Sequence, residues 1–520
     1  MVSSSSCPRH SAVRGFRLER TKLGSSATLP DRRLEEIVNR RDFVKFGGIA
    51  AIELGASRLF SAQSPPGTPG TQAANNIPQN SKADFTLRIA PVTVELTPTR
   101  IISTIGYNGT APGPTLRMKE GQPVIVEVIN ETDVPELVHW HGLLIPPEVD
   151  GVEEEATPLV PPQGRIRYQF TPKPAGTRWY HSHVMAGADL HRGSYTGQFG
   201  FLIIEPASNP GNYDREIFLA LREWEPFFNP EENDDDEETN SGPQPERPAK
   251  LDTSPTGLEV GYQMFSINDK SLGAGEPVRV KQGERVMMRL LNASASMNRR
   301  IALPGHRFQI IALDGNAVPS PQTVEVIDIG PGERVDAVIE MNQPGNWILG
   351  TTTDDVRNGG MGVVIEYANQ HKQPQWIAPG KSVWDYTIFG GTTAQPAADR
   401  TVDMIFQKIP SGAGLFNSWT VNGKEYPHEQ EFVLKQGARH RLVFRNRSED
   451  AHPLHLHRHL FELVEINGKA TSGIMKDTVV VPGYGRVSVD LIADQPGLTL
   501  FHCHIQQHMD YGFKALFRYA

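Results

Sequence analysis

Met118-Lys119-Glu120-Gly121-Gln122-Pro123-Val124-Ile125-Val126-Glu127-Val128-Ile129-Asn130 is the stretch that decides the fold. It begins with a glycine-containing turn and continues with valines at every second position, up to Asn130. Apolar side chains at every second position predict a β-strand with one buried face. On its own, this stretch predicts one strand of a half-buried sheet.

The same unit occurs twice more along the chain. Residues 280–292 and 434–446 each have Lys-Gln-Gly after one apolar residue and reach an asparagine nine residues after the glycine, as residues 118–130 do. Glycines at Gly176, Gly345 and Gly497 each precede an aromatic or β-branched strand. We therefore predict an all-β fold of three consecutive Greek-key β-sandwich domains, at residues 84–205, 214–368 and 400–520.

Composition restricts the class of protein. The chain has 520 residues, 38% of them hydrophobic, a net charge of −9, 48 glycines and 41 prolines. The abundant glycine and proline are typical of many short strands joined by turns. The negative charge argues against nucleic acid as a partner, because phosphate binding requires a basic surface. Cys7 and Cys503 are the only cysteines, so a disulfide framework is excluded.

The N-terminal region has the features of an export leader. Asn39-Arg40-Arg41-Asp42-Phe43-Val44-Lys45 resembles the twin-arginine signal, which predicts a leader over residues 1–62 and a periplasmic or otherwise exported protein. The apolar run 46–60 is too short and too charged to span a bilayer. Residues 63–83 read as a disordered linker, and the acidic run 231–238 as a solvated loop.

Histidines occur at matching places in the first and third copies only. Nine residues after Asn130 and Asn446 are His139 and His455, whereas Ile301 stands nine after Asn292. Five and seven residues after the glycines, His181 and His183 match His502 and His504, but the middle copy has Gly350 and Thr352 there. Four His-X-His pairs result, namely His139/His141, His181/His183, His455/His457 and His502/His504.

Paired histidines of this kind predict a metal centre. Residues separated by one position share a strand face, so the eight imidazoles are expected to meet where the first and third domains touch. Imidazole suits copper, zinc, iron and nickel. Outside the pairs, His452, Cys503 and His508 form a His₂Cys set typical of blue-copper electron transfer, which favours copper over zinc. Cys503 lies between His502 and His504 and faces away from them, so one strand would connect two metal sites.

These motifs, in this order, resemble the multicopper oxidase family, which includes laccases, bilirubin oxidases and metal oxidases. The resemblance covers residues 84–520 and implies three cupredoxin domains and four copper ions. It implies a type 1 copper on His452, Cys503 and His508, and a type 2 copper on His139 and His455. It implies that the two type 3 coppers bind His141, His181 and His504 on one ion and His183, His457 and His502 on the other.

Two positions depart from the family pattern. The usual glycine between His457 and His459 is Arg458 here, which puts the local turn and substrate access in question. The axial position, ten residues after Cys503, is Phe513, which cannot coordinate a metal. Because the axial ligand tunes a blue-copper site, we expect a comparatively high potential.

Acidic residues near the cluster are candidates for proton supply. Asp150 matches an acidic position of the family that is implicated in this role, although an Asp150-Gly151 turn explains the residue equally well. A second acidic residue carried by some bacterial members corresponds to Met509, and Asp510 could replace it.

The resemblance implies an enzyme that couples one-electron oxidation of a reducing substrate to the four-electron reduction of O₂ to water. His508 would be the point of electron entry at the type 1 copper, with transfer through Cys503 to His502 and His504. We expect a phenolic or other aromatic donor, as in laccases. A metal-ion oxidase acting on Cu(I), Fe(II) or Mn(II) is the alternative, and a copper-sequestering protein is the alternative of another class.

Overall fold

The structure is a computed structural model that describes residues 81–208, 211–229, 257–370, 372–393, 395–411, 415–428 and 432–520. These residues belong to one compact unit, Thr68–Ala520. The predictions for the leader (1–62), most of the linker (63–83) and the acidic run (231–238) fall outside the described residues. In the part that is described, no helix combines the length and the apolar character needed to cross a bilayer.

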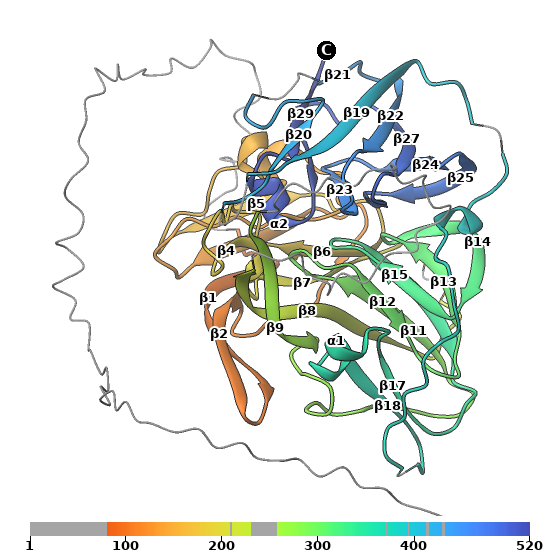
Figure 1. Cartoon of the computed structure of the whole chain (residues 1–520). Helices are drawn as coiled ribbons and strands as arrows, with labels where there is room; N and C mark the ends of the chain where they lie inside the picture. Colours follow the sequence, from red (N-terminus) through yellow and green to blue (C-terminus); the bar gives the residue numbers. More distant parts are fainter. Residues whose placement is uncertain are drawn as a thin grey trace, which may run out of the picture. The chain divides into compact units, whose positions relative to one another are not determined.

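The first sandwich pairs a four-stranded with a three-stranded sheet (Figure 1). The strand order is β2-β1-β4-β5 in one sheet and β3-β7-β6 in the other. The predicted alternating stretch forms β4, whose three valines are buried with residues of the facing sheet. The strands are β1 (Phe85–Thr97), β2 (Arg100–Tyr107), β3 (Leu116–Lys119), β4 (Val124–Asn130), β5 (Arg165–Phe170), β6 (Gly176–His181) and β7 (Phe199–Glu205).

The middle sandwich has a six-stranded sheet, β14-β13-β16-β11-β8-β9, and a five-stranded sheet, β10-β18-β17-β12-β15. Its strands are β8 (Arg215–Asn229), β9 (Glu259–Ile267), β10 (Val278–Val280), β11 (Arg285–Asn292), β12 (Arg299–Ala302), β13 (Phe308–Leu313), β14 (Asn316–Val324), β15 (Val326–Ile329), β16 (Arg334–Glu340), β17 (Asn346–Thr351) and β18 (Gly362–Tyr367).

The third sandwich has the sheets β20-β19-β22-β27-β24-β25 and β21-β29-β28-β23-β26. Its strands are β19 (Arg400–Ile409), β20 (Ser418–Val421), β21 (Phe432–Leu434), β22 (Arg439–Asn446), β23 (His452–Leu456), β24 (Phe461–Ile466), β25 (Lys469–Lys476), β26 (Thr478–Val481), β27 (Arg486–Ile492), β28 (Thr499–Cys503) and β29 (Lys514–Tyr519).

Helices are few and short. They are α1 (Asp354–Asn358), α2 (Gln506–Asp510) and the 3₁₀ turns η1 (Pro147–Val149), η2 (Glu153–Glu155), η3 (Gly193–Tyr195) and η4 (Tyr386–Phe389). The predicted all-β fold of three consecutive sandwiches is confirmed. Its physical basis is the repeated alternation of buried and exposed side chains.

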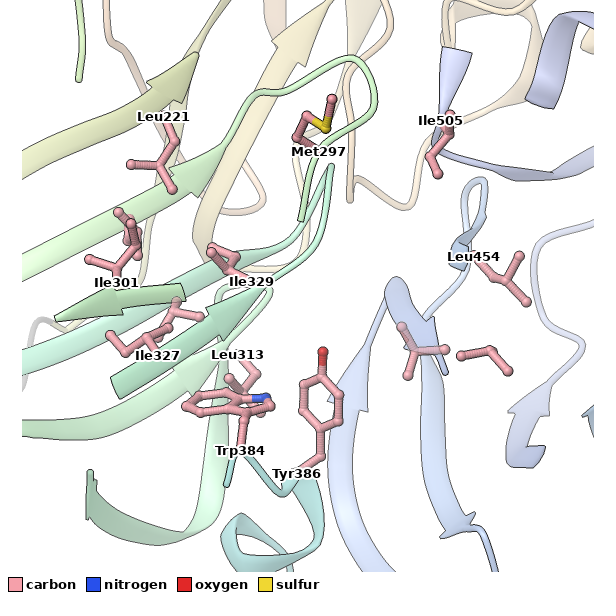
Figure 2. Close-up of a cluster of buried hydrophobic side chains, with 14 of the residues drawn as sticks. Leu221, Met297, Ile301, Leu313, Ile327, Ile329, Trp384, Tyr386, Leu454 and Ile505 are labelled. Atoms are coloured by element: carbon pink, nitrogen blue, oxygen red, sulfur yellow. The ribbon is translucent and has the colours of Figure 1, made fainter. Parts of the chain in front are cut away.

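A continuous apolar core joins the middle and third sandwiches. Figure 2 shows Trp384 and Tyr386, from the connection between the two sandwiches, standing between their strands. Trp384 and Phe389 pack with ring centroids 5.1 Å apart. The two sandwiches are therefore held as one body, which fixes the third sandwich relative to its neighbours.

Candidate metal centre

The histidine pairs lie where strands end. His181 closes β6, His455 is within β23 and His502 is within β28, while the second member of each pair lies just past its strand. His139 forms an isolated bridge with His181 and belongs to no named strand. The sequence predicted that both members of a pair lie on one strand. In the structure only the first residue of three pairs lies in a strand, and the turn after the strand places the second residue.

All eight paired histidines converge between the first and third sandwiches, and each is at most 7% exposed. Ring centroids are 3.8 Å apart for His141 and His455, and 4.1 Å apart for His139 and His457. His183, His457 and His502 form a third close set, in which one ring nitrogen of each lies within 4.8 Å of the others. The sequence predicted that these histidines meet between the first and third sandwiches, and in the structure they lie together there.

Hydrogen bonds fix the tautomer of most of these rings. Nδ1–H donates to a backbone carbonyl in the four residues His139, His181, His455 and His502, each at 2.8 Å. His457 Nδ1–H donates to Asp150 Oδ2 at 2.9 Å. A neutral imidazole that donates through one nitrogen presents a lone pair at the other. In these five residues Nε2 is therefore the free ligand atom.

The free nitrogens face one another without partners. His457 Nε2 lies 3.0 Å from His502 Nε2, and His183 Nε2 lies 3.3 Å from the same atom. The Nε2 atoms of His139, His181 and His455 and both ring nitrogens of His504 are buried without a hydrogen-bond partner in the described chain. Buried polar atoms are normally paired, and facing lone pairs repel. Cations between these nitrogens resolve both problems, so the residues fit a multinuclear metal site.

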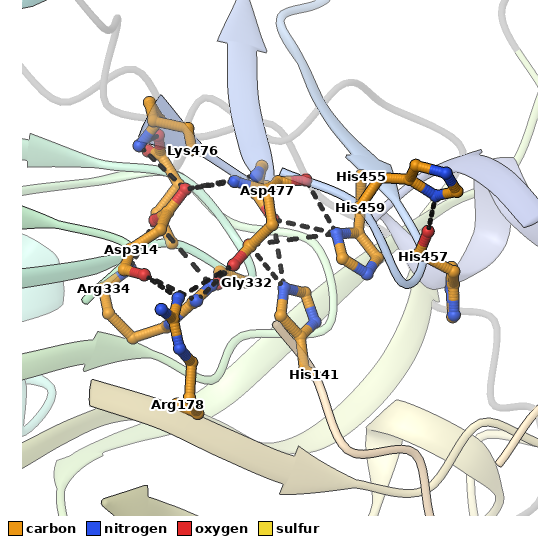
Figure 3. A network of polar contacts seen from close by, with 12 residues as sticks. His141, Arg178, Asp314, Gly332, Arg334, His455, His457, His459, Lys476 and Asp477 are labelled. Carbon is orange, nitrogen blue, oxygen red and sulfur yellow. Dashed lines mark hydrogen bonds and ion pairs between the residues drawn. The ribbon is translucent and has the colours of Figure 1, made fainter. Parts of the chain in front are cut away.

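His141 is oriented the opposite way from its neighbours (Figure 3). Its Nε2 lies 3.0 Å from Asp477 Oδ1 and 3.1 Å from Thr478 Oγ1, while its Nδ1 is buried and unpaired within the described residues. An ionised carboxylate only accepts hydrogen bonds, so Nε2 carries the proton. His141 therefore presents Nδ1 to the cluster.

A second site is formed by Cys503, His452 and His508. Cys503 Sγ lies 3.7 Å from the Nδ1 atom of each histidine. His452 Nε2–H donates to Ser448 Oγ at 2.9 Å, which leaves Nδ1 facing the sulfur. Phe513 is fully buried, with its ring 4.9 Å from that of His452. Within the described residues, Phe513 covers this site on one side with hydrocarbon.

Burial governs the protonation of this second site. It lowers the pKa of His452 to about 4 and raises the pKa of the Cys503 thiol. A neutral imidazole is ready to bind a metal, whereas the thiol needs a metal ion to displace its proton. A soft thiolate with two imidazoles is the donor set of copper electron-transfer sites. The set therefore fits copper.

The two sites are joined through β28. Leu454 pairs with Cys503, and His455 pairs with His502, in the antiparallel register of β23 and β28. Since Cys503 is joined by peptide bonds to His502 and His504, only a few covalent bonds separate its sulfur from two histidines of the larger cluster. The predicted connection between the sites is present in the fold.

Asp150 lies beside the larger cluster and is fully buried. Its Oδ2 lies 2.9 Å from His457 Nδ1 and 3.3 Å from His139 Nδ1. Asp510, in contrast, accepts hydrogen bonds from the backbone amides of Ala186 and Gly187 at 2.9 Å and 2.8 Å. Asp150 thus contacts candidate ligands, and Asp510 binds the loop that follows the His181/His183 pair.

Arg458 forms a buried ion pair with a glutamate of the first sandwich. Its Nε lies 2.8 Å from Glu155 Oε2, and both side chains are buried. Its guanidinium also donates to Leu498 O at 2.7 Å and to Thr499 Oγ1 at 2.8 Å, and Glu155 Oε1 accepts from Leu500 N at 2.6 Å. Arg458 adopts a left-handed conformation, φ 55°. The pair joins η2 of the first sandwich to β28 of the third.

Sequence reasoning missed Asp477 and Glu155. Neither residue belongs to a spaced motif, and both act through partners more than 100 positions away, such as His141 and Leu500. A buried ion pair between distant segments leaves no periodic signal. These residues could be found only from the tertiary structure.

Comparison with known proteins agrees with this geometry. Family models described as multicopper oxidase match residues 89–209, 239–373 and 402–520, which together make up most of the chain. The chain is 29% identical to the multicopper oxidase MmcO of Mycobacterium tuberculosis over 434 residues, covering 81% of this chain and 84% of that protein.

Two solved structures are similar in fold. One is a multi-copper oxidase from Pseudomonas thermotolerans, with 25% identity, a TM-score of 0.62, and coverage of 84% of this chain and all of that one. The other is Fet3p, a multicopper oxidase that functions in iron import, with 18% identity, a TM-score of 0.66, and coverage of 84% and 90%. The three sandwiches are thus cupredoxin-like, and the chain belongs to the multicopper oxidase family of copper-dependent oxidoreductases that use O₂.

Proposed function

We propose that this protein is a four-copper oxidase with a laccase-like donor site. In this proposal the three cupredoxin domains span residues 84–205, 214–368 and 400–520. The type 1 copper binds His452, Cys503 and His508, and the type 2 copper binds His139 and His455. The type 3 coppers bind the two triplets His141, His181 and His504, and His183, His457 and His502.

The observation that carries the proposal is a pair of facing, unprotonated ring nitrogens. His457 and His502 both donate through Nδ1, and their Nε2 atoms lie 3.0 Å apart inside a buried site, with His183 Nε2 at 3.3 Å from His502 Nε2. Burial also lowers the pKa of each of these histidines, so protonation does not relieve the repulsion. Several cations with a preference for imidazole account for the arrangement.

When bound, the coppers would accept electrons one at a time and deliver four of them to O₂. Residues of the chain itself provide the remaining functions. Cys503 joins the donor side to the cluster through His502 and His504. Asp150 accepts a hydrogen bond from His457 and leaves Oδ1 without a partner within the described residues, which suits it to hold a water or pass a proton.

Aromatic side chains near His508 favour an aromatic donor. Trp419 packs on His508 with ring centroids 4.1 Å apart. Tyr511 stacks on Phe416 at 4.6 Å, and Phe228 packs on Phe416 at 5.0 Å. Trp419 is buried, whereas Phe416 and Tyr511 are partly exposed, and such flat apolar rings suit a planar organic molecule through offset stacking. Oxidation of a metal ion is the alternative, and Fet3p, a relative in fold, is described as functioning in iron import.

The decisive experiment is O₂ uptake by copper-loaded protein with a panel of phenols, Fe(II), Cu(I) and Mn(II). We expect the fastest uptake with phenols, together with a blue thiolate-to-copper absorption and about four coppers per chain. Faster uptake with one of the metal ions would support the metal-oxidase alternative. Tight copper binding without uptake of O₂ from any donor would contradict an oxidase and support sequestration.

We also propose export through the twin-arginine-type leader, on the basis of Arg40 and Arg41. Replacing both arginines by lysine keeps the charge and removes the receptor-read pair. The expected result is loss of the protein from the exported fraction of cells. Unchanged fractionation would contradict this proposal and would not affect the copper assignment.

A further inference from the structure

The middle sandwich reaches the histidine cluster although it has no histidine at the matching positions. Its loop between β15 and β16 contains Gly332 and leads into Arg334. A Cβ atom added at Gly332 would lie 2.7 Å from the ring of His504. The loop therefore packs directly against a candidate ligand, and only glycine leaves room for the ring.

Arg334 is completely buried, and all five of its N–H groups have acceptors. Nε donates to Thr177 O at 3.3 Å. Nη1 donates to Gly332 O at 2.8 Å, and Nη2 donates to Asp314 O at 3.2 Å. The remaining two N–H groups form a bidentate pair with Asp477, at 2.7 Å to Oδ1 and 2.5 Å to Oδ2. Arg334 thus contacts all three sandwiches at one point.

Asp477 connects Arg334 to ligands of two sandwiches (Figure 3). Its Oδ1 accepts from Nε2–H of His141, in the first sandwich, at 3.0 Å. Its backbone carbonyl accepts from Nδ1–H of His455, in the third sandwich, at 2.8 Å. The carboxylate of Asp477 therefore determines which nitrogen His141 presents to the cluster. The backbone carbonyl of Asp477 determines the same for His455.

The turn that carries Asp477 is also held by the middle sandwich. Asp314 Oδ2 accepts from Thr478 N at 3.1 Å and forms an ion pair with Lys476 at 3.0 Å. Lys476 in turn lies 3.0 Å from Glu333. Both the side chain and the backbone of Asp477 are thus positioned by residues outside its own sandwich.

We propose that Arg334 is a positioning residue of the copper cluster, which acts through Asp477 to hold His141 with Nδ1, and His455 with Nε2, facing the metal. This inference rests on the proposed four-copper assignment. It gives the middle sandwich a role in the metal site itself, although this sandwich carries none of the proposed copper ligands. Partners that orient metal ligands typically change metal affinity by about 10- to 100-fold when they are replaced.

The test compares two lysine substitutions in the middle sandwich. Arg334→Lys keeps the positive charge but cannot form the planar bidentate pair with Asp477. Arg299→Lys is the matched control, because Arg299 is equally buried and pairs with Glu223 at 2.9 Å within the middle sandwich. Both proteins are loaded with copper and dialysed against a chelator. Copper per chain, the type 2 electron paramagnetic resonance signal, the blue absorption and the melting temperature are then measured.

We expect Arg334→Lys to bind cluster copper about 10- to 100-fold more weakly and to show an altered type 2 signal, with its blue absorption retained. Arg299→Lys should lower the melting temperature without either change. An unaltered copper content and type 2 signal in Arg334→Lys would overturn the inference. If Arg334→Lys does not fold, Asp477→Asn, which keeps the side-chain size, must alter the type 2 signal or the inference fails. A wild-type protein without a type 2 signal would contradict the four-copper assignment itself.

Discussion

The middle and third sandwiches have the same strand order but opposite roles at the metal centre. The order β14-β13-β16-β11-β8-β9 corresponds strand for strand to β25-β24-β27-β22-β19-β20, and β10-β18-β17-β12-β15 to β21-β29-β28-β23-β26. In the third sandwich, β23 and β28 carry His452, His455, His502 and Cys503. In the middle sandwich, the corresponding β12 and β17 have the sequences RRIA and NWILGT. The same strand order therefore forms with and without the candidate metal-binding residues.

A histidine outside the ligand set is present in both sandwiches. The hydroxyl of Tyr367 donates to His306 Nε2 at 2.5 Å, and the hydroxyl of Tyr519 contacts His459 Nε2 in the same way. In both pairs the histidine Nδ1–H donates to a backbone carbonyl two residues earlier. These pairs belong to the framework of the sandwich. The comparison thus separates histidines that build the fold from histidines that present free nitrogens.

The largest effect is expected from removing the thiol of Cys503, because only the third sandwich has such a group. Cys503→Ser replaces the soft thiolate by a hydroxyl, so the type 1 site should lose its copper, its blue absorption and oxidation of the donor. Absorption and O₂ uptake measure this directly. A Cys503→Ser protein that remains blue would show that the blue site lies elsewhere.

Asp150→Asn tests the carboxylate that the first sandwich contributes. We expect O₂ reduction to slow by about 10²- to 10⁴-fold, as for loss of an acid–base group, with the blue absorption unchanged. The exposed neighbour Glu153→Gln is the matched control and should have no effect. Bleaching of the blue site in Asp150→Asn would indicate a structural role.

Arg458→Gly tests the ion pair between the first and third sandwiches. The substitution relieves a left-handed conformation but leaves Glu155 buried and uncompensated, so we expect a loss of about 3–5 kcal/mol in the free energy of unfolding. The double variant Arg458→Gly/Glu155→Gln should recover part of this loss, because the buried charge is gone. Denaturant unfolding provides the measurement, and equal stability of the single and double variants would contradict the pairing.

Leu290→Ala tests the scaffold role of the middle sandwich. Leu290 lies in β11 and is fully buried in the shared core, so its truncation should cost about 2–5 kcal/mol in the free energy of unfolding. The blue absorption of the folded protein should not change. A shifted absorption in the folded variant would mean that packing in the middle sandwich reaches the type 1 site.

The smallest change is expected from Phe513→Met, which adds a weak axial donor to the type 1 site. An added axial donor stabilises the more highly charged Cu(II) state more than the Cu(I) state, so we expect the potential to fall. Redox titration followed by the blue absorption measures it. An unchanged or higher potential would contradict our prediction that Phe513 leaves this copper at a high potential.

The sequence alone determined the all-β fold and the residues of both candidate metal sites. Strand alternation and the nine-residue interval from glycine to asparagine are local features, so they can be read without coordinates. The histidine pairs at matching intervals after Asn130 and Asn446 were equally visible. Their absence from the middle copy predicted which two sandwiches would share the cluster.

The tertiary structure alone decided how the candidate ligands are oriented. Whether His141 presents Nδ1 or Nε2 depends on Asp477, and the position of Asp477 depends on Arg334. The pairing of Arg458 with Glu155 depends in the same way on the contact between two sandwiches. Hydrogen bonds and ion pairs between segments more than 100 residues apart arise from packing and have no period along the chain. Spacing therefore identified the candidate ligands, and packing determines which atoms they present.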